Sequence, residues 1–391
     1  MNLTPLFTPF RLRQITLRNR FTVPAMQRGV CENGAPTRAL ADYYRRRAEG
    51  GFSLILSEAC AIDHPSAGQE GKVVRMTEST RSAWRMCVDA VGEAGGHMLI
   101  QLNHRGGMRR EEDSEGPDTP SAILSPSGLV KAGTPGGRAV TPADMQALKA
   151  SYVRSALIAQ EVGAAGVEIH GAHGFLLDQF LWSETNLRDD GYGGPDLRAR
   201  ARFPSEVVAA VRAAAGADFI ISYRFSQWKV LDYSNARIAR TPDELRLVLG
   251  LLRDAGVDLF HVSTRQFNTP EWPEDPRTLA GWTKVLTDAA VMAVGGVGNS
   301  GDLQSVRNGL IEQEIAQGDV VRRSLADVLR RFEGREFDLI AVGRASIGDP
   351  DWVRKVEAGD FDSIRAFDRQ HLLTIIDSAN AALRPIHAIS S

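Results

Sequence analysis

Residues 162–170 have the sequence Val162-Gly163-Ala164-Ala165-Gly166-Val167-Glu168-Ile169-His170, in which small residues and glycines precede a short apolar strand. Glycine just beyond a helix favours the left-handed conformation that ends it. A continuous apolar run of about four to eight residues is typical of a parallel strand covered by helices on its outer face. The same pattern precedes strands expected at 52–59, 97–102 and 257–262. These repeated units indicate an alternating α/β protein.

Two of the helices between these strands begin alike, with Thr141-Pro142 and Thr241-Pro242, each followed by an acid at the third helical position. A threonine cap and a proline in the first turn are typical of a helix start. Further apolar runs at 21–25, 219–224, 291–294 and 339–342 bring the expected strands to eight. We therefore predict a (β/α)8 TIM barrel. A doubly wound open sheet is the alternative, but no G-x-G-x-x-G follows the first strand.

The length beyond a minimal barrel falls in four segments, and no linker divides residues 1–391 into separate domains. Residues 1–20 are expected to form an N-terminal hairpin that closes the bottom of the barrel. Residues 103–140, rich in Gly and Pro, are expected to be a capping segment in the long loop after the third strand. Residues 299–336 are strongly charged and are compatible with a lid, an interface or a helix insertion. A C-terminal helix is expected near 368–383.

The composition excludes several protein classes. The 46 basic and 48 acidic residues give a formal charge of −2, which argues against a dedicated nucleic-acid-binding protein. The three cysteines do not form a disulfide framework or a metal motif, so they suit a reducing compartment. The sequence contains no run of about 18 apolar residues, so it predicts no membrane helix. We expect a cytoplasmic enzyme that acts on a small molecule, without nucleic-acid or membrane partners, and a homo-oligomer is compatible with the sequence.

Polar groups follow the expected strands at their carboxyl ends, where a barrel of this kind has its active site. Gly295 and Gly296 follow the seventh strand, and Gly343 and Arg344 follow the eighth. Glycines let backbone N–H groups approach a phosphate, and an arginine adds a bidentate cation. The sequence therefore predicts a phosphate site there, although plain turn glycines are the alternative.

His170 and His173 stand three residues apart at the end of the fourth strand. A zinc pair would need a third ligand, and none is evident. A structural pair at a strand end is a second interpretation. Two neutral imidazoles that donate to a substrate oxygen are a third, because such donors stabilise a developing oxyanion. The spacing alone leaves all three open.

A longer pattern surrounds these histidines. Residues 167–194 have the sequence VEIHGAHGFLLDQFLWSETNLRDDGYGG, which resembles the signature of the Old Yellow Enzyme family of FMN-dependent ene-reductases. Other family motifs follow in order along nearly the whole chain: Leu6-Phe7-Thr8-Pro9, Leu17-Arg18-Asn19-Arg20, Ile100-Gln101-Leu102, Arg224, Ala293-Val294-Gly295-Gly296-Val297 and Val342-Gly343-Arg344-Ala345. Larger relatives add an iron–sulfur cluster and a nucleotide domain, and with three scattered cysteines we expect neither here.

The resemblance implies FMN at the barrel mouth and NADPH or NADH as reductant, with ping-pong reduction of the activated C=C bond of an enone-type substrate. Gln101 would bind the isoalloxazine ring, and Arg224 would lie near its N1/O2 edge. His170 and His173 would be catalytic, binding the oxygen of the substrate. The cofactor-binding residues it implies are Pro24, Ala25, Met26, Gln27, Ala59, Gln101, Arg224, Gly295, Gly296, Gly343 and Arg344.

Two departures from the family pattern bear on the reaction. Phe175 stands where members usually carry the tyrosine that protonates the α-carbon, and phenylalanine has no proton to give. This favours an alternative, a flavin reductase that acts mainly on nitro compounds or quinones; a flavin-binding protein without alkene chemistry is a third hypothesis. Gln27 stands where many relatives have Thr or Cys. We expect Phe175, His261 and Trp272 to line the substrate pocket, and a structural role for His104.

Overall fold

Eight parallel strands form a closed barrel in the computed structural model, which describes residues 1–68, 73–109, 123–299, 317–372, 374–376 and 383–385. In chain order they are β3 (Phe21–Val23), β6 (Leu54–Leu56), β8 (His97–Asn103), β13 (Gly166–His170), β14 (Ile220–Phe225), β15 (Leu259–Ser263), β16 (Ala290–Val294) and β17 (Leu339–Ala341). Neighbours pair in parallel, and pairing of β13 with β8 closes the ring. The prediction of a (β/α)8 barrel is confirmed.

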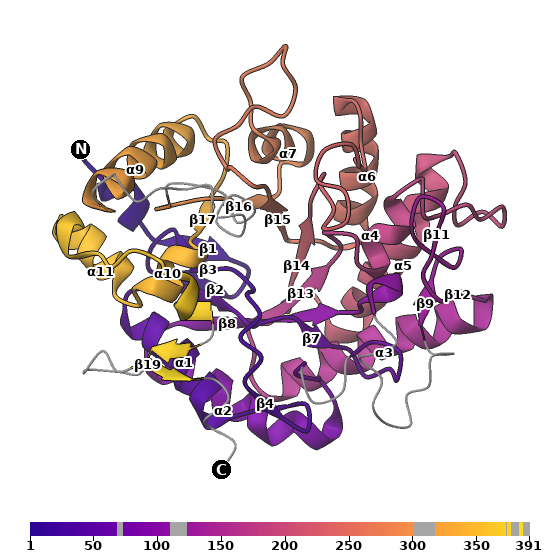
Figure 1. Ribbon diagram of the computed structural model, residues 1–391, viewed down its shortest axis with the longest axis horizontal. Helices are drawn as coiled ribbons and strands as arrows, with labels where there is room; N and C mark the ends of the chain where they lie inside the picture. Colours follow the sequence, from indigo (N-terminus) through magenta and orange to yellow (C-terminus); the bar gives the residue numbers. More distant parts are fainter. Residues whose placement is uncertain (69–72, 110–122, 300–316, 373, 377–382, 386–391) are drawn as a thin grey trace.

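Helices surround the barrel (Figure 1). The longer ones are α1 (Arg38–Glu49), α2 (Arg81–Glu93), α3 (Pro142–Glu161), α5 (Leu197–Ala215), α6 (Pro242–Ala255), α7 (Leu279–Thr287) and α9 (Gln317–Glu333). The shorter ones are α4 (Leu176–Leu181), α10 (Arg344–Gly348) and α11 (Trp352–Ala358). The predicted helix starts are present: the Thr141 hydroxyl accepts from the backbone N–H of Asp144, and the Thr241 hydroxyl accepts from that of Glu244. Gly256 ends α6 with φ +119°.

Short elements lie in the connections. The 3-10 turns are η1 (Thr4–Phe7), η2 (Glu78–Thr80), η3 (Gly106–Met108), η6 (Phe361–Ser363) and η7 (Arg369–Leu372). The short strand pairs are β4 (Cys31–Glu32) with β5 (Ala35–Pro36), β9 (Leu124–Ser125) with β12 (Arg138–Ala139), β10 (Leu129–Lys131) with β11 (Thr134–Pro135), and β18 (Thr374–Ile376) with β19 (Leu383–Pro385). β7 (Cys60–Ala61) pairs with the end of β8.

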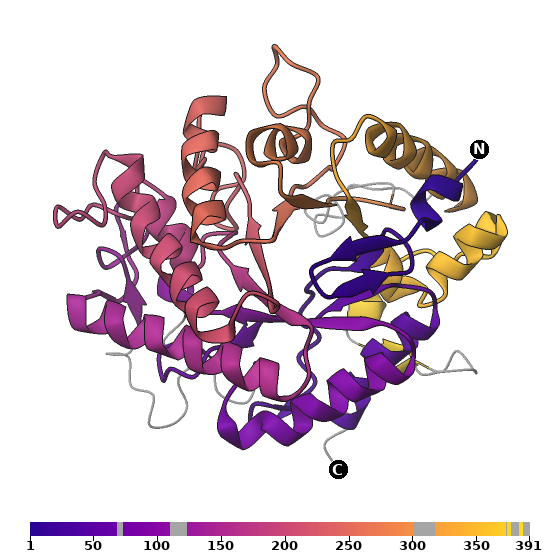
Figure 2. The same ribbon diagram turned by 180° about the vertical axis from the view of Figure 1, so that it is seen from behind.

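The N-terminal segment forms the hairpin that the sequence predicts. β1 (Phe10–Leu12) pairs antiparallel with β2 (Ile15–Leu17), and the hairpin faces the viewer in Figure 2. Its buried side chains Leu12, Ile15 and Leu17 share one apolar cluster with residues from barrel strands, among them Leu54, Leu99, Ile220, Leu259, Met292 and Leu339. The hairpin therefore closes the amino-terminal end of the barrel, which leaves the carboxyl ends of the strands as the open mouth.

The predicted C-terminal helix near 368–383 is wrong for the part that the structure describes. That part contains η7, β18 and β19, and β18 pairs antiparallel with β19. The cause is the sequence Thr374-Ile375-Ile376, because three consecutive β-branched residues favour extended backbone over helix.

Two other long segments are only partly described. In the expected capping segment 103–140, residues 110–122 lie outside the described part, and the remainder carries η3 and the strands β9 to β12. In segment 299–336, residues 300–316 lie outside it, and the remainder is largely α9. This helix connects β16 to β17, so that part of the segment belongs to the ordinary barrel repeat.

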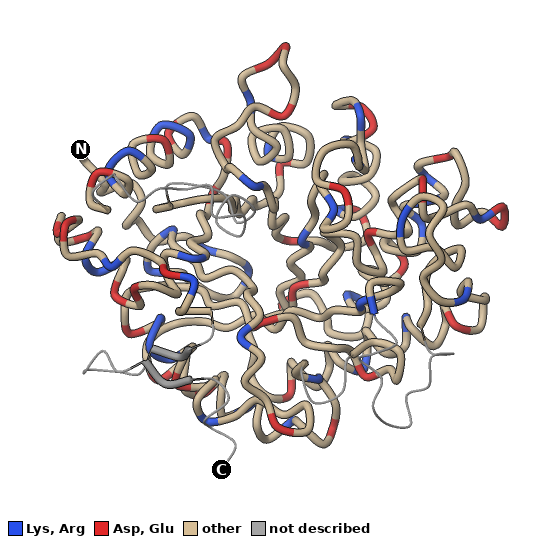
Figure 3. Tube along the Cα trace, in the orientation of Figure 1, with Lys and Arg blue, Asp and Glu red and all other residues tan. Residues whose placement is uncertain are grey.

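Charged residues of both signs are interspersed along the outer helices (Figure 3). Within the described ranges, none of the helices combines the length and the apolar character that crossing a membrane requires.

Replacing Leu17 by alanine tests the closure of the barrel bottom. Leu17 has no exposed surface, so the truncation should cost about 2–5 kcal/mol of stability through lost burial and a residual cavity. Leu187 is 63% exposed, and its replacement by alanine is the matched control. Thermal unfolding should show a clear loss for Leu17→Ala and little change for Leu187→Ala. Equal effects of the two substitutions would contradict the packing described here.

Candidate active site

A buried carboxylate, Glu168, joins four strands just inside the mouth of the barrel. Its Oε1 accepts from the Gln101 amide at 2.7 Å, and its Oε2 accepts from the Ser222 hydroxyl at 3.0 Å. The same Oε2 lies 2.7 Å from Nδ1 of His261. Glu168 therefore fixes the side chain of Gln101, one of the residues expected to bind the flavin ring.

The charge state of this group follows from its neighbours. Burial alone would raise the pKa of Glu168, but His261, Arg224 and Gln101 together lower it to about 2. Burial lowers the pKa of His261, in spite of the adjacent carboxylate. Glu168 is therefore the ionised partner, and it accepts a hydrogen bond from the Nδ1–H of a neutral His261.

Arg224 spans the mouth of the barrel from the end of β14. In the eight-stranded ring, β14 and β3 are four strands apart in either direction. The Arg224 Nη1 nevertheless donates to the carbonyl of Ala25, just after β3, at 3.2 Å. Its Nη2 donates to the Ser263 hydroxyl at 3.3 Å, and its buried Nε has no hydrogen-bond partner among the described residues. The guanidinium thus lies over the open end of the barrel, and its Nε still lacks a hydrogen-bond partner among the described residues.

The two histidines after β13 meet through defined ring atoms. Nε2 of His170 lies 2.9 Å from Nδ1 of His173, and the ring centroids are 5.1 Å apart. Nε2 of His173 lies 2.8 Å from the Ser263 hydroxyl. Nδ1 of His170 is buried without a partner in the described part of the chain. These two nitrogens are in direct contact, so an oxygen ligand would bind to both only by replacing this contact.

Both imidazoles are neutral at physiological pH. Burial, reinforced by the nearby Arg224, lowers the pKa of His170 to about 3 and lowers that of His173 well below its ordinary value. A neutral imidazole carries one N–H donor and one acceptor. The pair can consequently offer hydrogen bonds to an oxygen without adding positive charge.

A second layer of contacts holds His173 in an uncommon backbone conformation, with φ +67°. Its backbone N–H donates to the Ser226 hydroxyl at 3.0 Å, and the Trp228 ring packs on its imidazole with centroids 4.5 Å apart. Beside it, the fully buried Lys229 and Asp178 form an ion pair at 2.6 Å. The other carboxylate oxygen of Asp178 accepts from the backbone N–H of Gly174, so the turn after His173 is fixed as well.

A second buried carboxylate, Glu58, holds the loop that follows β3. Its Oε2 accepts from the backbone N–H groups of Arg28 and Gly29, at 2.8 and 3.0 Å, and its Oε1 has no partner in the described residues. Burial raises the pKa of Glu58 to about 7, although those two N–H groups and Arg28 oppose the shift. The loop also contains the predicted cofactor-binding residues: Pro24 is buried, Ala25 and Met26 are half-buried, and Gln27 is exposed.

Two of the three glycines of the predicted phosphate site are required by the backbone. Gly295 and Gly296 have φ +155° and +73°, and an added Cβ would lie 2.7 Å from the Thr264 carbonyl and 2.6 Å from the Gln266 amide oxygen, respectively. Gly343 differs, because a Cβ there would meet nothing closer than the Met26 sulfur at 3.6 Å. A side chain at Gly343 would thus make ordinary contacts; Gly343 is half-buried, and the half-buried Arg344 follows it.

These observations fit FMN. A flavin needs polar groups at its ring edge, and Gln101 and the unsatisfied Nε of Arg224 supply them. A phosphate needs exposed backbone and a cation, which the half-buried Gly343 and Arg344 would supply. The roles of these residues and of Ala59, which follows Glu58, stay predictions.

The remaining predicted residues lie at different depths. Phe175 is half-buried, and its ring meets the edge of His170 with centroids 4.8 Å apart. His261 is fully buried beneath the mouth on Glu168. Trp272 packs on Trp282 and donates to the carbonyl of Arg240, so neither of these contacts reaches the histidine pair. Their substrate-binding roles stay predictions.

His104 bonds to Ser66 and to the backbone N–H of Gly106. Cys60 and Cys87 are buried, and Cys31 is half-buried with a pKa raised by burial to about 11. These contacts agree with structural roles for all four residues. Over the described ranges, the structure contains no group of three or more His, Cys, Asp or Glu side chains arranged to hold a metal ion.

Sequence reasoning missed Glu168, Ser263, Trp228 and the Asp178–Lys229 pair. The one signal available was that acidic and basic residues stand within or next to apolar strands, where an unpaired charge is costly. Glu168 interrupts the run from Val167 to Ile169, and Lys229 follows β14 within four residues. The partner of each could not be found without the fold.

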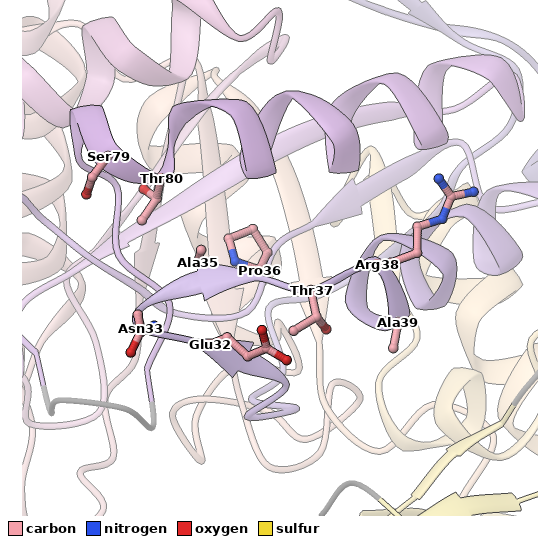
Figure 4. A pocket seen from close by; sticks show the side chains of 9 residues that line it. All are labelled: Glu32, Asn33, Ala35, Pro36, Thr37, Arg38, Ala39, Ser79 and Thr80. Atoms are coloured by element: carbon pink, nitrogen blue, oxygen red, sulfur yellow. The ribbon is translucent and has the colours of Figure 1, made fainter. Parts of the chain in front are cut away.

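A separate hollow lies away from the histidine pair, between the β4–β5 hairpin and the start of α2. Figure 4 shows Glu32 and Thr37 along it, with the guanidinium of Arg38 directed away from Glu32. Its lining includes none of the residues at the barrel mouth. We therefore place the candidate active site at the mouth.

Comparisons with known proteins identify the family of the chain. The model of the NADH:flavin oxidoreductase / NADH oxidase family matches residues 5–362. An NADH oxidase of Thermoanaerobacter brockii is 31% identical over 366 residues, which are 92% of this chain but 52% of that protein. A 12-oxophytodienoate reductase 7 of Oryza sativa subsp. japonica is 33% identical over 225 residues, 55% of this chain and 56% of that protein. The chain thus spans about half the length of each of these two relatives.

A solved structure, the old yellow enzyme homologue from Zymomonas mobilis, has the same fold. It superposes with a TM-score of 0.73 at 22% identity, covering 95% of this chain and 96% of that one.

Glu58→Gln should change how stability depends on pH. Because the folded-state pKa is raised to about 7 from an ordinary 4.5, the folded protein keeps this proton while the unfolded chain loses it. Wild-type stability therefore falls as pH rises from about 4.5 to about 7, by an amount on the order of 3 kcal/mol. Glutamine cannot titrate, so the melting temperature of the variant minus that of the wild type should rise across this window.

The exposed Glu184→Gln is the matched control. A difference between Glu58→Gln and the wild type that stays constant from pH 4.5 to 8 would contradict the raised pKa.

Proposed function

The chain belongs to the NADH:flavin oxidoreductase / NADH oxidase family of FMN-dependent oxidoreductases, and we propose that it takes hydride from NAD(P)H and reduces the activated C=C bond of α,β-unsaturated carbonyl compounds. The observation that carries the proposal is the pair His170 and His173. Two neutral imidazoles meet through opposed nitrogens at the barrel mouth, beside Arg224.

FMN, when bound, accepts hydride from the nicotinamide and passes it to the substrate. Gln101 and Arg224 would hold its ring, and Gly343 and Arg344 would hold its phosphate. The loop held by Glu58, which includes Met26 and Gln27, would lie along the ring. Because the reductant and the alkene would use the same mouth in turn, we propose ping-pong kinetics.

The histidines supply the activation of the alkene. Hydrogen bonds from His170 and His173 to the carbonyl oxygen draw electron density toward that oxygen and make the β-carbon more electrophilic. Removing one preorganised donor of this kind typically costs about 10²–10³-fold in turnover. Phe175 packs against His170 and restricts where a substrate ring can lie.

A second candidate function is reduction of nitro compounds or quinones. Phe175 favours it, because that position offers no acid for the α-carbon. Tyr233 does not fill the gap directly, since the Trp228 ring lies between it and His173: Trp228 stacks on Tyr233 at 5.3 Å and packs on His173 at 4.5 Å. The proton for an alkene must then come from water or from another group, whereas a quinone or nitro group takes its protons on oxygen.

Anaerobic stopped-flow measurements test the proposal. The FMN-loaded protein is reduced with one equivalent of NADPH or NADH and then mixed separately with cyclohexenone, a maleimide, a nitroaromatic compound and a quinone. We expect fast reoxidation by the two alkenes, with saturated products. Reoxidation by the nitroaromatic compound or the quinone alone would favour the second function. A protein that cannot be loaded with FMN would overturn both.

Phe175→Tyr tests whether proton supply limits alkene reduction. General-acid catalysis is typically worth about 10²–10⁴-fold, so a tyrosine at this position should raise cyclohexenone turnover by up to that range. Quinone reduction should change little, because it needs no proton on carbon. Unchanged alkene turnover would mean that another proton source already suffices.

A further inference from the structure

Ser263 ends β15 and links two groups of the site. Its hydroxyl lies 2.8 Å from Nε2 of His173 and accepts from Nη2 of Arg224 at 3.3 Å. The residue is only 3% exposed, so its hydroxyl proton needs a partner within the protein.

The direction of the hydrogen bond from Ser263 to His173 follows from the donor inventory. A guanidinium only donates, so the Ser263 oxygen is the acceptor toward Arg224. Among the hydrogen bonds of the described residues, Nε2 of His173 is the acceptor within reach of the hydroxyl proton. A neutral ring whose Nε2 accepts carries its proton on Nδ1. The positive charge of Arg224 favours the same arrangement. A Ser263 hydroxyl that donates to His173 directs a lone pair of its oxygen toward the guanidinium.

We propose that Ser263 is a positioning residue that fixes His173 as the Nδ1–H tautomer and thereby makes His173 the permanent oxygen-binding donor of the pair. The inference rests on the proposed function in one respect: Nδ1 is the atom that would face the oxygen of a carbonyl, nitro or phenolate ligand.

The orientation of the His173 ring is fixed as well as its tautomer. The Trp228 ring packs on one side of it, and the Trp228 Nε1 donates to the backbone carbonyl of Ser263 at 3.1 Å. The Ser226 hydroxyl holds the backbone N–H of His173. A 180° ring flip would exchange nitrogen and carbon positions and break the contacts to both Ser263 and His170.

His170 lacks a corresponding partner. Its Nε2 faces the Nδ1–H of His173, and its buried Nδ1 has no hydrogen bond within the described part of the chain. Without a ligand, His170 accepts from His173. An oxygen ligand that replaces this contact would accept from the Nδ1–H of His173, and His170 would donate to it from Nε2 once its proton has moved from Nδ1 to Nε2. The pair is therefore asymmetric, with a fixed donor and an adaptable one, and it suits a ligand oxygen that only accepts.

The test measures tautomers directly in FMN-loaded protein labelled with ¹⁵N-histidine. Long-range ¹H–¹⁵N spectra identify which nitrogen of His173 carries the proton, and His173→Gln assigns its signals. We expect Nδ1–H in the wild type and in Ser263→Thr, which keeps the hydroxyl. Ser263→Ala should give a mixture of tautomers or Nε2–H. The matched control, Ser226→Ala, removes the hydroxyl that holds the backbone of the same histidine and should leave Nδ1–H unchanged.

A ligand titration gives a second measurement that does not require turnover. The dissociation constant of 4-nitrophenolate, followed by its absorbance with oxidised enzyme at pH 8, should rise about tenfold in Ser263→Ala, as expected for one weakened hydrogen bond. Ser263→Thr should restore it.

Nε2–H in the wild type, or Nδ1–H unchanged in a folded Ser263→Ala, would overturn the inference. If Ser263→Ala does not fold, the tautomers of the wild type and of Ser263→Thr decide the question. These outcomes are separate from those for the proposed function, because a wild-type Nδ1–H tautomer together with failure to reduce any alkene would refute the function alone.

Discussion

Closure of the parallel sheet between β8 and β13 is the constraint on which the site depends. The register pairs Gln101 with Glu168 and Glu168 with Ser222, so three polar side chains from neighbouring strands stand in one row. Two residues further along, His170 pairs with Arg224 and Arg224 with His261. Because alternate residues of a strand face the same side, the second row lies directly above the first and at the mouth. A shift of one residue in any of these pairings would turn the polar groups outward toward the helices.

Burial of the charged Glu168 in the first row would be costly in isolation. Arg224 in the second row helps to explain how this charge is tolerated. An ionised carboxylate inside a barrel is stable only when hydrogen bonds and an opposite charge replace its hydration. Glu168 has three donors, and Arg224 lies in the row above. The same guanidinium helps to keep His170 and His173 neutral. One buried cation thus stabilises the structural carboxylate and keeps the two imidazoles as uncharged donors.

The repeated αβ pattern was enough to predict the eight strands, the helix starts at Thr141 and Thr241 and the hairpin before β3, because each depends on local periodicity or capping. The C-terminal helix failed because Thr374-Ile375-Ile376 favours a strand that finds its partner several residues later. At the site, position at a strand end drew attention to His170 and His173, but only the family resemblance assigned roles to them and to Arg224, and those roles stay predictions. The roles of Ser263, Glu58 and Asp178 were not accessible, because each depends on a contact with a residue distant in sequence that only the closed barrel creates.

The electrostatics divide the site into a part that does not titrate near neutrality and a part that does. The pKa of His170 is about 3 and that of His173 is also strongly lowered, so the protonation of the pair does not change near neutral pH. Glu58, with a pKa of about 7, does change its charge in this interval. Its ionised form is the stronger acceptor for the backbone N–H groups of Arg28 and Gly29. A rise in pH through 7 therefore places a buried negative charge beside the loop that carries Met26 and Gln27, while the protonation of the two histidines does not change. A change in the site near neutral pH should accordingly originate at Glu58 and the loop it holds, and not at the histidine pair.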